Sequence, residues 1–243
     1  IMMKLLDCTL RDGGYYNNWD FDIDVVNDYL QAMESLEIDF VEIGFRSLKN
    51  HGFKGAFAYS NDTFLKTLKI PKGLSNKIGV MINGSEICEP ETQISLLKKL
   101  FKPKKHSIVS LVRVACHVDE FKNCLPAANW LKENGYLVGF NLMQISDRSL
   151  EDITKLAKEA SSYPIDVLYF ADSLGSLDQE KLEQIILAFK KGWNYELGIH
   201  THDNMGQAVN NSKQAIKLGA NWIDSTVTGL SLIHISEPTR QLQ

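Results

Sequence analysis

The chain has 243 residues, 44% of them hydrophobic and 23% charged, so it is long enough to bury a full core as one domain. A formal net charge of −4 and a pI near 5.9 provide no broad positive surface for nucleic acid or for an anionic membrane. The four cysteines are too few and too irregularly spaced for a disulfide framework, and no apolar run is long enough to cross a bilayer. These features favour a soluble cytoplasmic protein that is large enough to be an enzyme.

Short apolar or β-branched runs alternate along the chain with amphipathic segments. They predict eight strands, at residues 4–9, 40–45, 77–83, 107–116, 136–143, 165–171, 196–202 and 222–229. Capping-box spacings predict two helix starts, at Ser149 with Asp152 and at Ser176 with Gln179. Three glycines stand where helices should end: Gly135, Gly192 and Gly219.

Nearly continuous apolar strands that alternate with helices predict a parallel sheet covered by helices. Eight such units in a chain of this length favour a closed (β/α)8 TIM barrel, with residues 1–229 as one catalytic domain. The alternative is an open Rossmann-like sheet, which would require a glycine-rich turn after the first strand. Gly13 and Gly14 lack the spacing of that turn and are followed by two tyrosines.

Polar residues gather in or just after the predicted strands, and the active sites of such barrels lie at the carboxyl ends of the strands. In chain order they are Thr9, Arg11 and Asp12, then Glu42, Asn83, Arg113, His117, Gln144, Asp172, Ser173, His200 and His202. The distribution predicts a functional site at this end of the barrel.

A His-x-His pattern ends the seventh predicted strand. Side chains alternate along a strand, so His200 and His202 project from one side, roughly 6 to 7 Å apart along the chain. With Asp12 from the first strand they would form a two-histidine, one-carboxylate set for a divalent metal. Asp203 points to the opposite face and would orient a ligand or cap a helix. The alternative is that the histidines are merely polar residues of the barrel rim.

Arg11, if it is buried beside a metal, needs a carboxylate partner. Glu42 in the neighbouring predicted strand can supply one. A purely structural ion pair between the two residues is an equally acceptable interpretation.

Five motifs fall on five predicted strands in one order: DCTLRDGG, VEIGF, VRVACH, ADSLG and HTHDN. Together they resemble the DRE-TIM metallolyase superfamily over residues 4–229. This superfamily includes hydroxymethylglutaryl-CoA lyase, isopropylmalate synthase and 4-hydroxy-2-oxovalerate aldolase. VRVACH and YFADSLGS are most similar to the aldolase-like branch.

The resemblance implies that Asp12, His200 and His202 bind manganese or magnesium, with zinc as a further option. It implies that Arg11 stabilises an enolate oxygen, that Glu42 holds Arg11, and that Ser173 contacts substrate. Other strand-end residues are further candidates for substrate contact: Arg113, His117 and Gln144. The implied reaction cleaves or forms a 4-hydroxy-2-oxo acid, with pyruvate or a related 2-oxo acid and an aldehyde as the other reactants. A homo-oligomer and an aldehyde dehydrogenase partner are expected by analogy with the family.

The first motif departs from this pattern, because Tyr15 stands where the aldolases have a catalytic histidine. An unperturbed tyrosine has a pKa of about 10 and is a poor base at neutral pH. Either Tyr15 is strongly perturbed or the proton goes to Tyr16, His117 or a metal-bound water. Tyr15 could also line a pocket for a different aldehyde, or pack with Tyr16 and Trp19 across the barrel mouth.

The end of the chain also departs from the family. The resemblance implies a glycine-rich loop ending in a metal-binding asparagine and then a last helix, but the chain reads LSLIHISEPTRQLQ. This string resembles a translated sequencing adapter, so residues 230–243 are interpreted as a non-native tail. His234 and Glu237 are therefore excluded from the site. The eighth helix is expected to be missing, and a chain truncated after its eighth strand is expected to be unstable or inactive.

Two other functions remain as alternatives to the aldolase. One is a Claisen-type synthase or lyase of the same superfamily that uses an acyl-CoA. The other is a non-catalytic barrel that binds metal but has lost its base at Tyr15.

Overall fold

Eight parallel strands close into a barrel, each paired with its sequence neighbour and β8 paired with β1. The computed structural model describes residues 3–50, 52–172, 177–202 and 206–227. The strands are β1 (Lys4–Asp7), β2 (Phe40–Phe45), β3 (Ile78–Asn83), β4 (Val109–Cys116), β5 (Leu137–Leu142), β6 (Val167–Asp172), β7 (Glu196–Thr201) and β8 (Trp222–Ser225). The predicted TIM barrel is confirmed. The predicted tail, residues 230–243, lies outside the described residues.

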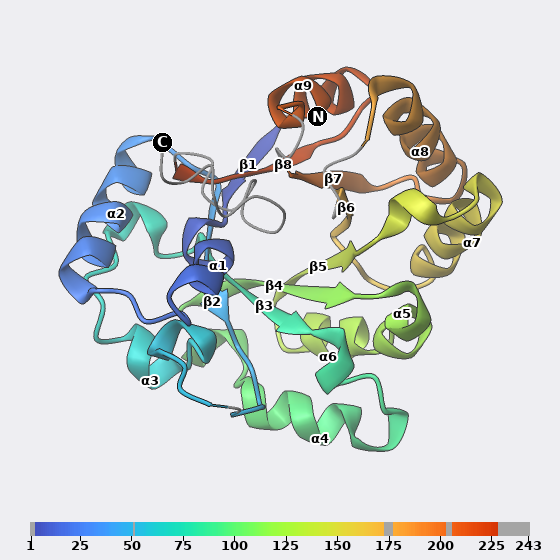
Figure 1. Cartoon of the computed structure of the whole chain (residues 1–243). Helices are drawn as coiled ribbons and strands as arrows, with labels where there is room; N and C mark the ends of the chain where they lie inside the picture. Colours follow the sequence, from blue (N-terminus) through green and yellow to red (C-terminus); the bar gives the residue numbers. More distant parts are fainter. Residues whose placement is uncertain (1–2, 51, 173–176, 203–205, 228–243) are drawn as a thin grey trace.

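Helices surround the barrel, while the short α1 lies against the barrel mouth (Figure 1). The helices are α1 (Thr9–Gly13), α2 (Ile23–Ser35), α3 (Asp62–Leu65), α4 (Pro90–Leu100), α5 (Val118–Cys124), α6 (Ala127–Glu133), α7 (Leu150–Ala160), α8 (Gln179–Gly192) and α9 (Ala208–Lys217). Short 3-10 turns occupy Gly14–Tyr16, Ala56–Ala58, Lys72–Leu74, Gly84–Glu86, Lys104–His106 and Ile145–Asp147. Within the described ranges, no helix is both long and apolar enough to span a membrane.

Local sequence signals explain most element boundaries. The Ser149 hydroxyl accepts from the Asp152 N–H at 3.1 Å, which confirms the predicted start of α7. The predicted capping box at Ser176 is wrong. The carboxylate of Asp178 caps α8 instead, by accepting from the Lys181 N–H at 2.8 Å. The first strand ends at residue 7 rather than 9, because the following residues form α1.

Two apolar cores hold the barrel. The larger core lies between the strands and the surrounding helices. The smaller core fills part of the barrel interior and consists of Leu6, Cys8, Phe40, Leu111, Val167, Tyr169 and Trp222. Arg113, Glu42 and Asp224 alternate with these residues along β4, β2 and β8, so a buried polar layer continues the apolar one. The residues of the candidate site contact this polar layer.

Gly198 provides the space that the Tyr169 ring occupies in the barrel interior. A Cβ added at Gly198 would lie 2.4 Å from Cε1 of that ring, whereas one added at Gly79 would meet its nearest atoms, in Leu111, at 3.5 Å. We expect Gly198→Ala to lower the free energy of unfolding by about 1–3 kcal/mol through overpacking. Gly79→Ala, the matched control, should change it by less than about 1 kcal/mol. Urea denaturation of both variants measures this, and equal losses would contradict the role given to Gly198.

Candidate metal centre

Of the three residues predicted to bind metal, the fold brings Asp12 and His200 into contact and places the His202 ring next to that of His200. Asp12 lies on α1, directly after β1, and His200 and His202 lie at the end of β7, with β8 between the two strands. Asp12 Oδ2 is 3.4 Å from His200 Nε2. The two imidazole ring centroids are 5.0 Å apart. All three residues are buried.

The hydrogen bonds of the two histidines select the same ring nitrogen for a metal. His200 Nδ1 lies 2.8 Å from Asp224 Oδ2, and His202 Nδ1 lies 2.7 Å from the carbonyl oxygen of Asp172. A carbonyl oxygen only accepts, so Nδ1 of His202 carries the proton and Nε2 is the nitrogen suited to bind a metal. A carboxylate or carbonyl behind each histidine is the usual support of a metal-binding imidazole. The residues present therefore fit a divalent ion.

Cys8 is a neighbour of this site that the sequence did not reveal. Its Sγ and ligand atoms of Asp12 and His200 all lie within 4.8 Å of one another. Burial raises the pKa of the Cys8 thiol to about 12, so it stays protonated at neutral pH. A protonated thiol is a poor ligand, and two nitrogens with one carboxylate oxygen suit manganese, magnesium or zinc better.

The predicted pairing of Arg11 with Glu42 is confirmed. Arg11 Nε donates to Glu42 Oε1 at 2.7 Å, and Arg11 Nη1 donates to Asp12 Oδ1 at 2.7 Å. Burial lowers the pKa of Arg11, but the carboxylates of Asp12 and Glu42 outweigh burial and raise it. The guanidinium is therefore a fixed positive charge beside the candidate metal ligand.

Arg113 lies below the site rather than at its surface. It is fully buried, with Nε 2.5 Å from Glu42 Oε2, Nη2 2.7 Å from Glu42 Oε1 and Nη1 2.9 Å from Asp224 Oδ2. Each guanidinium nitrogen thus donates to a carboxylate, so the predicted contact between Arg113 and substrate gains no support from this geometry.

Asp224 is a second residue that the sequence analysis missed. It faces the barrel interior from β8 and joins Arg113 to His200. Burial raises its pKa, but Arg113 and the hydrogen bond from His200 outweigh burial and lower it. The alternation of WIDS places Asp224 on the same face as the buried Trp222, and this signal could have identified it.

Six of these side chains form a closed ring of alternating charges, which we call the charge ring. Its members in order are Glu42, Arg11, Asp12, His200, Asp224 and Arg113, and each contacts the next at 2.5 to 3.4 Å. Burial lowers the pKa of His200, but hydrogen bonds to Asp12 and Asp224 raise it well above its usual value. With His200 protonated, three positive groups balance the three carboxylates.

The remaining predicted site residues either lie away from the charge ring or fall outside the described residues. His117 is exposed directly before α5, where its backbone N–H donates to Glu120 Oε2 at 3.2 Å. Gln144 is exposed after β5, with a left-handed φ of 54°. Ser173 and Asp203 lie outside the described residues. The structure therefore brings neither His117 nor Gln144 into the charge ring.

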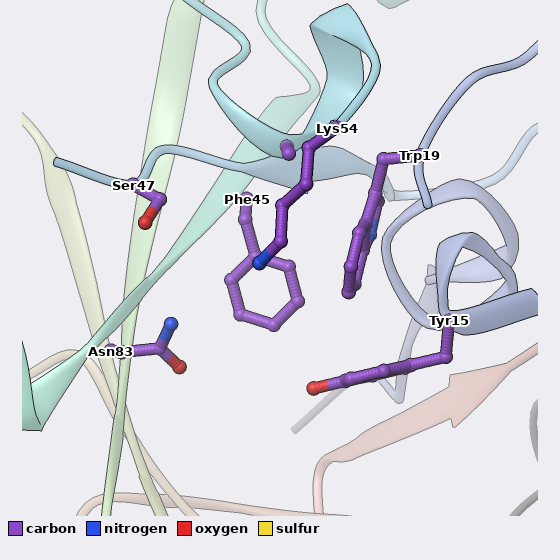
Figure 2. Close-up of a pocket in the computed structure, with 7 residues that line it drawn as sticks. Tyr15, Trp19, Phe45, Ser47, Lys54 and Asn83 are labelled. Carbon is purple, nitrogen blue, oxygen red and sulfur yellow. The ribbon is translucent and has the colours of Figure 1, made fainter. Parts of the chain in front are cut away.

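Tyr15 borders both the charge ring and a cavity at the barrel mouth. The cavity has a volume of about 150 Å³ and is lined by Tyr15, Trp19, Phe45, Ser47, Lys54, Ala58 and Asn83 (Figure 2). The Tyr15 ring packs edge-to-face on Trp19, with centroids 4.7 Å apart. Desolvation raises the pKa of Tyr15, although 51% of the residue is exposed. Its phenol is therefore protonated at neutral pH.

Comparison with known proteins yields one family and several relatives. Residues 104–231 match the HMGL-like family. A 4-hydroxy-2-oxovalerate aldolase from Geobacillus genomosp. 3 is 27% identical over 235 residues, which cover 94% of this chain and 65% of that protein. A protein named "Putative (R)-citramalate synthase" from Archaeoglobus fulgidus is 26% identical over 238 residues, which cover 95% of this chain and 46% of that protein.

A solved structure agrees with the fold. The "N-terminal domain of a putative aldolase" from Bacteroides vulgatus superposes with a TM-score of 0.81 at 32% identity, covering 94% of this chain and 74% of that one. This chain therefore shares the barrel fold of that domain and about one third of its residues over the matched region. It spans less than two thirds of the length of the two curated relatives.

Removal of the buried cation Arg113 from the charge ring should lower the free energy of unfolding more than removal of a surface cation does. Arg113→Met leaves Glu42 and Asp224 as buried carboxylates without their shared cation, and we expect a loss of about 3–5 kcal/mol in the free energy of unfolding. Lys132→Met is the matched control, because its ion pair with Asp166 is partly exposed; it should cost less than about 1 kcal/mol. Urea denaturation compares the two, and similar losses would show that the ring does not stabilise the barrel.

Proposed function

This chain belongs to the HMGL-like family of the DRE-TIM metallolyase superfamily, and on that premise we propose that it is a metal-dependent aldolase. It would cleave or form a 4-hydroxy-2-oxo acid, with a 2-oxo acid such as pyruvate and an aldehyde as the other reactants. The observation that carries the proposal is His200 Nε2 beside Asp12, with the His202 ring next to that of His200 and the guanidinium of Arg11 bound to Asp12.

Asp12, His200 and His202 would hold the divalent ion. When bound, the ion supplies Lewis-acid stabilisation of the negative charge that develops on the 2-oxo acid. With His200 protonated the charge ring is neutral, and exchange of that proton for a doubly charged ion leaves one net positive charge. A substrate carboxylate would balance that charge.

Arg11 would donate to the oxygen that becomes negative as the C3–C4 bond breaks. Glu42 and Asp12 bind its Nε and Nη1 and so fix the plane of the guanidinium. Among the described residues, no acceptor takes a hydrogen bond from its Nη2, which leaves this donor for the substrate. A donor fixed before reaction stabilises developing charge without a reorganisation cost. We assign Glu42 and Arg113 as positioning residues for Arg11.

Tyr15 would act as a hydrogen-bond donor rather than as a base. Its raised pKa keeps the phenol protonated at neutral pH, and its place between the charge ring and the cavity suits a contact with the oxygen of the aldehyde half. His117, the other candidate base, is exposed before α5 and outside the charge ring.

The direct test is release of pyruvate from a panel of 4-hydroxy-2-oxo acids, with manganese and with a chelator. We expect metal-dependent release that His200→Ala lowers by about 10³-fold or more. His106→Ala is the control, because His106 is exposed and precedes the amino end of β4, whereas the site lies at the carboxyl ends of the strands; this variant should keep full activity. Release that persists in the chelator or in His200→Ala would overturn the proposal.

The same assay tests Tyr15. Tyr15→Phe should lower kcat by about 10- to 100-fold, because it removes one hydrogen bond to the reacting oxygen while leaving the metal ligands intact. Manganese affinity, measured by calorimetry, should be unchanged in this variant. An unaltered kcat would show that Tyr15 only packs against Trp19.

A Claisen-type synthase is the second candidate, and the similarity to the Archaeoglobus fulgidus protein favours it. Coenzyme A release from acetyl-CoA in the presence of pyruvate, without any aldol cleavage, would establish it. Tight manganese binding with neither reaction would instead favour a non-catalytic metal-binding barrel.

Metal affinity should rise with pH. The raised pKa of His200 means that a proton occupies the metal-binding nitrogen until the pH exceeds that pKa, so proton and ion compete. Below the pKa, the apparent affinity for manganese should increase by about tenfold per pH unit for one displaced proton. Calorimetric titration between pH 6 and 8 measures the slope. An affinity that does not change over this range would contradict the competition.

A further inference from the structure

The cavity at the barrel mouth begins where the charge ring ends. Two residues connect the two regions: Tyr15 lines the cavity and interacts electrostatically with Arg11, and the Phe45 ring lies 5.7 Å from Arg11 Cζ. A substrate whose reacting atoms contact Arg11 would therefore extend its far end into the cavity. In an aldolase that far end belongs to the aldehyde half.

Among the described residues that line this cavity, Lys54 is the one that carries a charge. Its ammonium lies 5.3 Å from the centroid of the Trp19 ring and projects into the cavity (Figure 2). Within the described part of the chain, Lys54 makes no ion pair, and the Asn83 amide has no hydrogen-bond partner. Glu86 does not line the cavity; its carboxylate accepts from the Ser47 hydroxyl at 2.5 Å and from the Leu48 N–H at 2.6 Å.

The backbone holds Lys54 in this position. The N–H of Gly55 donates to the carbonyl of Asn18 at 2.8 Å, and a Cβ at Gly55 would lie 2.2 Å from the Trp19 carbonyl oxygen. Trp19 is itself buried, and its Nε1 donates to the Arg11 carbonyl at 2.7 Å. The loops after β1 and β2 are thus joined, and the backbone at Lys54 is held close to Trp19.

A cation in a partly apolar cavity loses part of its hydration, and without a counterion this loss is costly. An anionic ligand would supply the missing counterion, so the cavity favours a ligand with a negative charge. Trp19, Phe45 and Tyr15 supply apolar walls for methylene groups. We propose that this cavity is a subsite for a carboxylate on the aldehyde half of the substrate, with Lys54 as its cation and Asn83 as a further donor. The enzyme would therefore prefer a short aliphatic aldehyde that ends in a carboxylate. This inference rests on the proposed aldolase function and specifies its substrate class.

The test uses the condensation direction with pyruvate, manganese and two aldehydes of equal chain length, succinate semialdehyde and butanal. A carbon–carbon bond forms between the pyruvate methyl carbon and the aldehyde carbon; the methyl carbon loses one proton, the aldehyde oxygen gains one, and nothing is oxidised. We expect kcat/KM for succinate semialdehyde to exceed that for butanal by about 10-fold or more. Lys54→Met should remove this preference and leave butanal within about twofold of the wild-type value.

Two further variants separate charge from folding. Lys54→Arg keeps the cation and should retain most of the preference. Lys49→Met removes an exposed lysine of the same loop that does not line the cavity, and it should change neither substrate. Loss of the preference in Lys49→Met, or its survival in Lys54→Met, would overturn the subsite.

Binding without turnover distinguishes failure of the subsite from failure of the aldolase. Butanoate and butanamide match in shape but differ in charge. The binding of each is measured by the quenching of Trp19 fluorescence, and Trp19→Phe gives the background signal of the other tryptophans. Tighter binding of butanoate that depends on Lys54 would support the subsite even if no aldehyde reacts. Equal binding of the two probes, with both aldehydes turned over equally, would overturn the subsite and leave the aldolase intact.

Discussion

The site depends on the pairing of one carboxylate, that of Glu42, with two guanidinium groups. This carboxylate is completely buried on β2 and accepts from Arg11 on one side and Arg113 on the other. Two guanidinium groups so close together would repel each other strongly in a medium of low dielectric, and the shared carboxylate makes their approach possible. Arg11 then orients Asp12 from one direction, and Arg113 orients His200 through Asp224 from the other. Because the ring closes, displacement of one member disturbs the positions of both candidate metal ligands within it.

The barrel mouth is organised around Trp19, which links the charge ring to the neighbouring cavity. Its indole N–H donates to the carbonyl of Arg11, its ring makes T-shaped contacts with Tyr15 and Phe45, and Lys54 lies over the ring. The residue has a left-handed φ of 59°, and Gly14 leaves room for its side chain. A tyrosine in place of the family histidine is therefore part of an aromatic wall, whose low polarity raises the pKa of the phenol. The same wall shapes the space available to the far end of a substrate.

Much of the fold and part of the site could be predicted from the sequence, because both depend on local patterns. Continuous apolar runs predicted the seven strands β1 to β7 to within two residues at each end. The prediction for β8 was too long, because this strand ends at Ser225 rather than at residue 229. The early end of β1 arose where α1 begins directly after it. The contact of Arg11 with Glu42 and the approach of Asp12 to His200 followed from parallel strands, whose carboxyl ends meet at one end of the barrel. The helix start at Ser176 was wrong because Asp178, two residues later, is also a good capping residue and is the one that caps α8.

Local sequence patterns suffice to predict the barrel, the end of the barrel that holds the site, and the residue types that gather there, because strand periodicity and capping act over a few residues. Long-range packing, by contrast, sets Arg113 against two carboxylates instead of a substrate and places Asp224 behind His200. It also places Lys54 over Trp19, 35 positions earlier in the chain. These contacts join residues far apart in sequence, and their partners depend on strand register and on the docking of two loops. A charged residue in a sequence shows that a partner is needed, and the packed barrel determines which partner is near enough to satisfy it.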